Sequence, residues 1–168
     1  MGDIRRILYK IVALGLLIAV TFAFWGVAAE SLRLWGYRVN VMPFLVAAGS
    51  IFFSKEWGAG LGCFIGILCD TANGKTAGYY TVMYMLLAIL VGLIAERYYR
   101  TRFVPVLLSG YGIYLVSCLV RLLLDLVIPG QEEFSLFFTY FVPAGLYSAL
   151  WFLPLFPVIN YIYHRAED

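Results

Sequence analysis

The fold of this chain is most constrained by a series of apolar segments that are separated only by short charged or turn-forming breaks. The first of them, residues 11–29, runs for 19 residues without a charge. An α-helix needs about 20 apolar residues to cross a bilayer, whereas the apolar part of a secretory signal peptide has about 7–15. We therefore interpret this segment as a retained membrane helix and expect a membrane protein.

The composition points the same way. Hydrophobic residues make up 63% of the chain and charged residues 13%, and the mean hydropathy is +0.88. A soluble domain has about 25% charged residues. The net charge of only +2 excludes a broad basic surface for nucleic acid. The 168 residues leave no room for a separate soluble domain, so we expect one polytopic membrane domain over residues 1–168.

The apolar segments predict an all-α fold, a compact bundle of six transmembrane helices. The second and third predicted spans are short for a bilayer of about 30 Å. The last apolar block is long, and we begin its spanning part at Pro143, since proline suits the first turn of a helix. Residues 134–142 are left as an interfacial or re-entrant piece. The predicted spans are residues 11–29, 39–55, 57–70, 79–95, 103–128 and 143–163.

Basic residues predict the orientation, because loops on the cytoplasmic side are enriched in lysine and arginine. Placing both termini in the cytoplasm puts eight cations inside and three outside. Aromatic residues at the predicted interfaces, Tyr79 and Tyr80 among them, are expected at headgroup level. The inner cations are Arg5, Arg6, Lys10, Lys55, Arg97, Arg100, Arg102 and Arg165, and the outer ones are Arg33, Arg38 and Lys75.

A period of four residues runs through the third span. Residues four apart share one face of a helix, so the glycines form a groove without side chains that a neighbouring helix can approach closely. The first span has a matching row of small residues. These faces either pack on each other within the chain, or one of them receives a helix of a partner. The two rows are Gly58, Gly62, Gly66, Asp70, Gly74 and Gly78, and Gly15, Ala19 and Ala23.

Two charged residues, Arg121 and Asp125, lie four apart inside the fifth span. A charge in a membrane helix is unfavourable by about 2.5–3.5 kcal/mol unless it is paired or faces protein or water. Arg121 and Asp70 are expected at the same outer level, so we predict a polar cluster of Asp70, Arg121 and Asp125, with Asn73 or Glu30 as additions. Two structural alternatives stay open. Arg121 can pair with Asp125 alone and extend to the headgroups, and Asp70 and Asn73 can cap helix ends.

Little in the sequence points to catalysis or to a bound metal. His164 is the single histidine, so a histidine triad or a histidine-based metal site cannot be assembled. Cys63, Cys69 and Cys118 lie in apolar stretches without a CxxC pair and are interpreted as small hydrophobic residues. We expect no catalytic residues, no metal and no cofactor.

The glycine row resembles the central signature of the rod-shape-determining MreD family. The resemblance rests on residues 58–62 and 66–70, on Gly74 and Gly78, and on a helix that ends with residues 92–94; the chain length and Pro43 at the start of the second span also fit. By motif, the transferred positions are Gly58, Gly62, Gly66, Asp70 and Gly78. The resemblance implies a fold like that of the substrate-binding subunits of energy-coupling-factor transporters.

The resemblance also implies partners in the bacterial cell-elongation machinery: MreC, the actin-like MreB and the transglycosylase–transpeptidase pair that builds the wall. The expected function is then a non-enzymatic scaffold in the inner membrane that binds the membrane helix and juxtamembrane segment of MreC and contacts membrane lipids. The alternative is a small-molecule-binding or transport subunit with an outward-facing polar cavity, since ionisable residues in a membrane mark functional sites by default.

Overall fold

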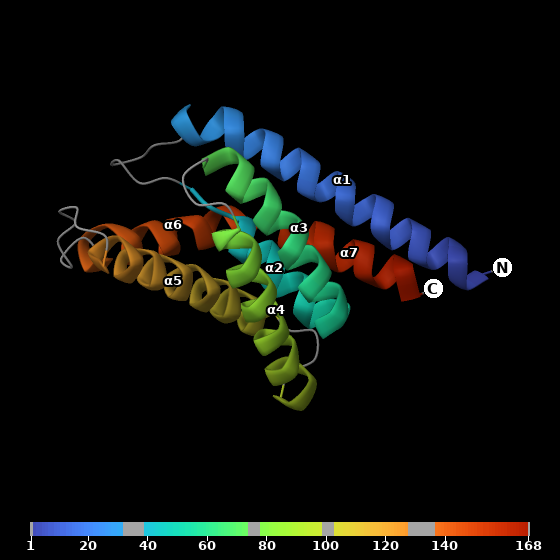
Figure 1. Cartoon of the computed structure of the whole chain (residues 1–168). Coiled ribbons are helices and arrows are strands. Elements are labelled where there is room, and N and C mark those ends of the chain that lie inside the picture. Colours follow the sequence, from blue (N-terminus) through green and yellow to red (C-terminus); the bar gives the residue numbers. More distant parts are fainter. Residues whose placement is uncertain (1, 32–38, 74–77, 99–102, 128–136, 168) are drawn as a thin grey trace.

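The computed structural model describes residues 2–31, 39–73, 78–98, 103–127 and 137–167, and all regular elements within these ranges are helices. Figure 1 shows their arrangement, with the N-terminal end of α1 and the C-terminal end of α7 at the same end of the molecule. The elements are α1 (Gly2–Ser31), α2 (Met42–Phe52), α3 (Lys55–Asn73), α4 (Tyr79–Tyr98), α5 (Phe103–Val127), the short π-helix η1 (Phe137–Phe141), α6 (Val142–Phe152) and α7 (Phe156–Glu167).

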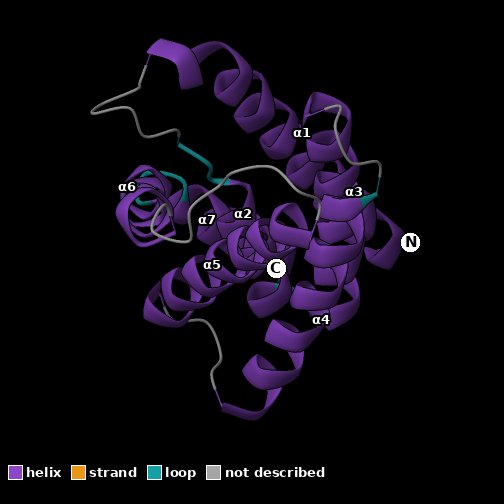
Figure 2. Ribbon diagram, turned by 60° about the vertical axis from the view of Figure 1, so that its left-hand side comes forward, coloured by secondary structure: helices purple, strands orange, loops and turns teal. Residues whose placement is uncertain are grey.

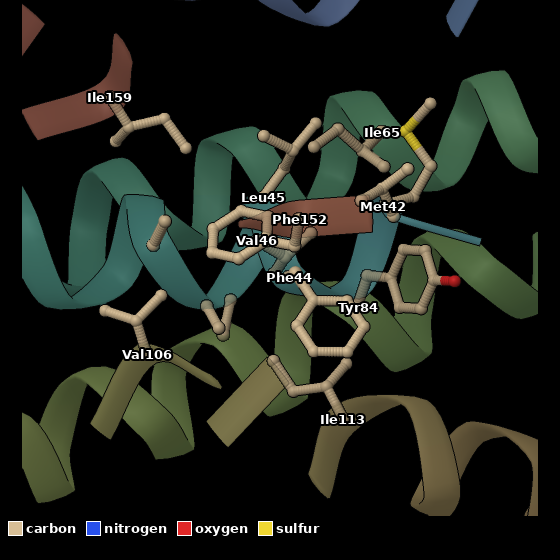
Figure 3. Close-up of a cluster of buried hydrophobic side chains, with 14 of the residues drawn as sticks. Met42, Phe44, Leu45, Val46, Ile65, Tyr84, Val106, Ile113, Phe152 and Ile159 are labelled. Carbon is tan, nitrogen blue, oxygen red and sulfur yellow. The ribbon is translucent and has the colours of Figure 1, made fainter. Parts of the chain in front are cut away.

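The core forms around α2, whose eleven residues are all buried. Figure 2 shows α2 in the middle, with α3 and α4 to one side and α5 and α6 to the other. Phe44 and Phe152 stack with ring centroids 5.5 Å apart, and both are fully buried. Figure 3 shows these rings together with Met42 and Tyr84. Helix α2 is therefore the centre of the bundle rather than one of its outer walls.

Helix α2 is shorter than the predicted span 39–55. It begins with Pro43 in its first turn, as the sequence suggested, and ends at Phe52. The chain then starts α3 at once, with Ser54 as the residue that caps its N-terminus. The Ser54 carbonyl accepts a hydrogen bond from the N–H of Gly58 at 2.8 Å, and its hydroxyl accepts one from the N–H of Trp57 at 3.4 Å. At 1.5 Å per residue, α2 is about 16 Å long, about half of a bilayer core.

The last apolar block forms two helices rather than one. Helices α6 and α7 meet at a bend of 50°. Pro154 lies at this bend and has no N–H to donate, and the chain turns there through the bonds from Leu153 N–H to the carbonyl of Leu150 and from Leu155 N–H to that of Phe152. Pro143 does occupy the first turn of α6. The helical chain already begins at Phe137, inside the predicted interfacial piece.

Two described helical segments are long and apolar enough to cross a membrane, Tyr79–Arg97 and Phe103–Leu123. The bent pair of α6 and α7 makes a third if it counts as one span, and residues 7–23 of α1 and helix α2 are shorter apolar helices. Leu86, Leu90 and Leu93 of α4 are all more than half exposed. Such a row of apolar side chains is unfavourable in water, so it indicates a membrane protein.

Candidate functional site

The glycine row of α3 lies against helices of the same chain. A Cβ added at Gly66 would collide with the backbone of Thr81 in α4, and one added at Gly62 would lie 2.7 Å from the carbonyl oxygen of Tyr84. A Cβ at Gly58 would lie 2.6 Å from the Cα atom of Ser50 in α2. Contacts this close are possible only for glycine. Helices α4 and α2 therefore fill the groove on α3.

Asp70 completes this face by binding the N-terminus of α4. Its Oδ1 atom accepts from the backbone N–H of Tyr80 at 2.9 Å, and its Oδ2 atom accepts from the backbone N–H of Thr81 at 3.0 Å and from the Thr81 hydroxyl at 2.6 Å. The first N–H groups of a helix have no partner within the helix, and a carboxylate there also interacts favourably with the helix dipole. Of the alternatives for Asp70, the structure shows the capping one.

The motif can now be explained physically. Gly62 and Gly66 allow the backbone of α4 to approach α3, and only at that separation does the short Asp70 side chain reach the first turn of α4. Gly78 is needed for another reason. It lies at the turn that precedes α4 and has a φ of +87°, in the left-handed region that favours glycine. At the opposite end of this helix pair, Lys55 and Glu96 form an ion pair of 3.3 Å.

The small-residue row of α1 does not lie on α3. Helix α1 packs on the bundle through Leu14, Ile18 and Thr21, which are all buried. Ala19 and Ala23 are exposed, and a Cβ added at Gly15 would have no atom within 4 Å. The row thus lies on the outward side of α1. A helix of a partner cannot reach the α3 groove, which is filled, but it can reach this row.

A cavity with polar lining residues lies where α2 and α4 begin and where α3, α5 and η1 end. Its volume is about 160 Å³. Helix α5 contributes Tyr114, Ser117, Cys118 and Arg121, which share one helix face by their spacing of three and four residues. The remaining lining residues are Val39, Asn40, Cys69, Tyr80, Tyr84, Tyr140 and Phe141.

Arg121 and Asp70 meet through a third residue. Arg121 Nη1 donates to the Tyr80 hydroxyl at 2.6 Å, and the backbone N–H of Tyr80 donates to Asp70. The described side chains show no direct ion pair between Asp70 and Arg121; both carboxylate oxygens of Asp70 accept hydrogen bonds from the start of α4. The other residues named for the cluster, Asp125, Asn73 and Glu30, have side chains outside the described part of the structure.

The tyrosines of the cavity were missed in the sequence, where Tyr79 and Tyr80 were interpreted as interfacial residues. Tyr84 is 1% exposed and hydrogen-bonds Asn40, and Tyr114 is 5% exposed and hydrogen-bonds Cys118. Tyr79 donates its hydroxyl to the Ser117 carbonyl at 2.6 Å. Their spacing could have indicated the cavity: Tyr80 and Tyr84 are four residues apart and so share one face of α4, as the cavity residues of α5 share one face of that helix.

The structure contains no disulfide among the described cysteines: Cys63, Cys69 and Cys118 are free thiols.

The comparisons with known proteins agree with the motif. A family model described as the rod shape-determining protein MreD matches residues 5–166. No curated protein and no solved structure matches the chain. The family match extends over nearly the whole chain and includes the face of Gly58, Gly62, Gly66 and Asp70. The chain therefore belongs to the MreD family of rod shape-determining proteins, a membership that implies a role in determining rod shape.

Proposed function

We propose that this protein is a non-enzymatic scaffold of the bacterial elongation machinery that binds MreC in the inner membrane and thereby supports peptidoglycan synthesis. The support is its family, whose role is shape determination, and a bundle that keeps a row of small residues on its outer side. MreB and the transglycosylase–transpeptidase pair are the further partners proposed within the same machinery.

The docking face for MreC is the outward row of α1. Gly15 and Ala19 lie one turn apart, and their apolar neighbours Val12 and Leu16 are 58% and 65% exposed. In a membrane, helices associate through close packing of small residues rather than through the hydrophobic effect. The glycines of α3 cannot serve this purpose because α4 and α2 already cover them. The outward row is thus the small-residue surface left for a partner.

The test combines Gly15→Leu with Ala19→Leu. A Cβ at Gly15 meets no atom within 4 Å and Ala19 is exposed, so the variant should melt like the parent protein in detergent while its co-purification with MreC falls about tenfold, a change of about 1.4 kcal/mol. Gly60→Leu is the matched control, since Gly60 on α3 also has open space around its Cβ. Undiminished association of the α1 variant, or an equal loss in the control, would contradict this docking face.

The polar cavity supports a second candidate function, a small-molecule-binding or transport subunit. The support is a cavity of about 160 Å³ whose lining includes Arg121, since an ionisable residue within the membrane part of a protein marks a functional site by default. A ligand-binding subunit is stabilised against heat by its ligand, whereas a scaffold is stabilised by its protein partner. Melting curves with candidate ligands and with MreC separate the two functions.

A further inference from the structure

We propose that the hollow at the start of α3, lined by Glu56, Trp57, Gly60 and Leu61, binds the ammonium headgroup of a membrane lipid. Phosphatidylethanolamine is the lipid class with this chemistry, since its headgroup carries a primary ammonium group. The hollow lies on α3 and the docking face proposed for MreC lies on α1, so the proposal holds whether or not α1 binds MreC.

The hollow is a space on the outer surface of α3. It has a volume of about 260 Å³ and is open on one side. Gly60 leaves this space free, because a Cβ added there would meet no atom within 4 Å. About 10–15 Å³ of such volume holds one water molecule. The hollow is therefore large enough for an ammonium group and the carbon atoms next to it.

The charge of the lining selects a cation. Glu56 is the one ionisable side chain among the four lining residues, and it is exposed. Within the described part of the structure its neighbour Lys55 pairs with Glu96 at 3.3 Å, whereas Glu56 accepts a hydrogen bond from the Ser54 hydroxyl. This hydrogen bond lowers the pKa of Glu56, so the carboxylate is ionised at neutral pH. The hollow thus presents a negative charge.

Trp57 provides a second attraction for an ammonium group. The face of an indole ring attracts a cation electrostatically, and tryptophan does so more strongly than the other aromatic residues. Tryptophan is also enriched at the interface between membrane and water, where the headgroups lie. A carboxylate and an indole that line the same hollow are together suited to an organic ammonium ion.

The rest of this helix face indicates that the ammonium group belongs to a lipid. Gly60, Phe64 and Ile67 follow Glu56 at spacings of four, four and three residues and so share its side of α3. Phe64 and Ile67 are 50% and 48% exposed. The surface changes from a carboxylate at the predicted cytoplasmic boundary to apolar side chains farther along the helix. A lipid has the same order of groups, an ammonium headgroup followed by acyl chains.

The experiment measures the melting temperature of the whole protein in a neutral detergent while a lipid is added. Phosphatidylethanolamine is compared with phosphatidylethanol of the same acyl chains, in which a hydrogen atom replaces the ammonium group. A ligand that binds the folded state raises the melting temperature with its concentration. We expect a larger rise with phosphatidylethanolamine than with phosphatidylethanol. Equal responses to the two lipids would overturn the proposal.

Two variants then locate the effect. Glu56→Gln keeps the size of the side chain and removes its charge, and Gly60→Leu fills the hollow. Each should raise the half-saturating concentration of phosphatidylethanolamine about tenfold or more. Gly112→Leu is the matched control and should respond like the parent protein, since Gly112 on α5 also has open space around its Cβ. The proposal is overturned if either Glu56→Gln or Gly60→Leu responds like the parent protein, or if the control loses the response equally.

Co-purification with MreC separates a lipid from a protein as the occupant. Glu56→Gln and Gly60→Leu should retain MreC as the parent protein does, because the proposed docking face lies on α1. If these variants lose MreC while their response to phosphatidylethanolamine is unaltered, the hollow binds a basic segment of a protein and the lipid proposal is wrong.

Discussion

Asp70 shows how one side chain can connect two helices. It receives three hydrogen bonds from Tyr80 and Thr81, ten and eleven residues further along the chain. The sequence already suggested capping as one of its functions, because aspartate favours helix N-termini. It did not show that Tyr80 stands between Asp70 and Arg121, since the spacing of residues along two helices does not specify which side chain fills the space between them.

The capping bonds predict a clear loss of stability when the carboxylate is removed. Asp70→Ala leaves the first N–H groups of α4 without this acceptor, so the free energy of unfolding should fall by about 1–2 kcal/mol. Thr71→Ala is the matched control, because Thr71 is exposed and its hydroxyl bonds only the nearby Leu68 carbonyl at 2.8 Å. Thermal melting in detergent measures both variants. Equal melting temperatures for Asp70→Ala and the control would refute the capping account.

At the scale of elements, the sequence predicted where helices occur better than how they end and bend. The fourth and fifth predicted spans correspond closely to α4 and α5, because long uncharged runs between charged residues leave little choice. The break between the second and third spans was predicted at residue 56 and lies at Ser54, whereas the 50° bend between α6 and α7 was not predicted. The apolar composition is the same on either side of that bend, so hydropathy does not reveal it.

The close contact between α3 and α4 predicts that replacing glycine by alanine affects the free energy of unfolding differently at two positions of α3. Gly66→Ala places a Cβ in the backbone of Thr81, which cannot yield as a flexible side chain would, so the free energy of unfolding should fall by about 1–3 kcal/mol. Gly60→Ala meets no atom and should leave stability unchanged or raise it by up to about 1 kcal/mol, as alanine favours a helix over glycine. Detergent melting of the two variants decides. If Gly66→Ala is tolerated as well as Gly60→Ala, the helices are not in backbone contact.

At the scale of the whole molecule, the sequence predicted an all-α membrane protein of the MreD family, and its family assignment is confirmed. The six crossings stay a prediction, with two described helical segments that pass as spans and a third if the bent pair counts as one. The number of crossings depends on how α1, the short α2 and α3 lie relative to the bilayer. Hydropathy along the chain cannot show that α2 is covered on all sides, because buried and lipid-facing positions carry the same residues.

The orientation supplies a prediction at this scale. With both termini in the cytoplasm, a C-terminal fusion to a reporter that matures only in the cytoplasm should be active. Replacing Arg97, Arg100 and Arg102 together by glutamine should produce a mixed orientation, since lysine and arginine near the ends of spans set topology. Replacing Arg33, Arg38 and Lys75, on the predicted outer side, should leave the reporter active. An inactive reporter on the unaltered protein would place the C-terminus outside.

The central claim is that α3 holds the bundle together internally while α1 presents the surface for MreC. Photo-cross-linking in cells tests it most directly, with the cross-linking residue placed at Ala19 on the outward row of α1 and, in parallel, at Leu108, a 72% exposed position of α5. The account predicts a cross-link to MreC from position 19 and none from position 108. A cross-link from position 108 together with none from position 19 would contradict it.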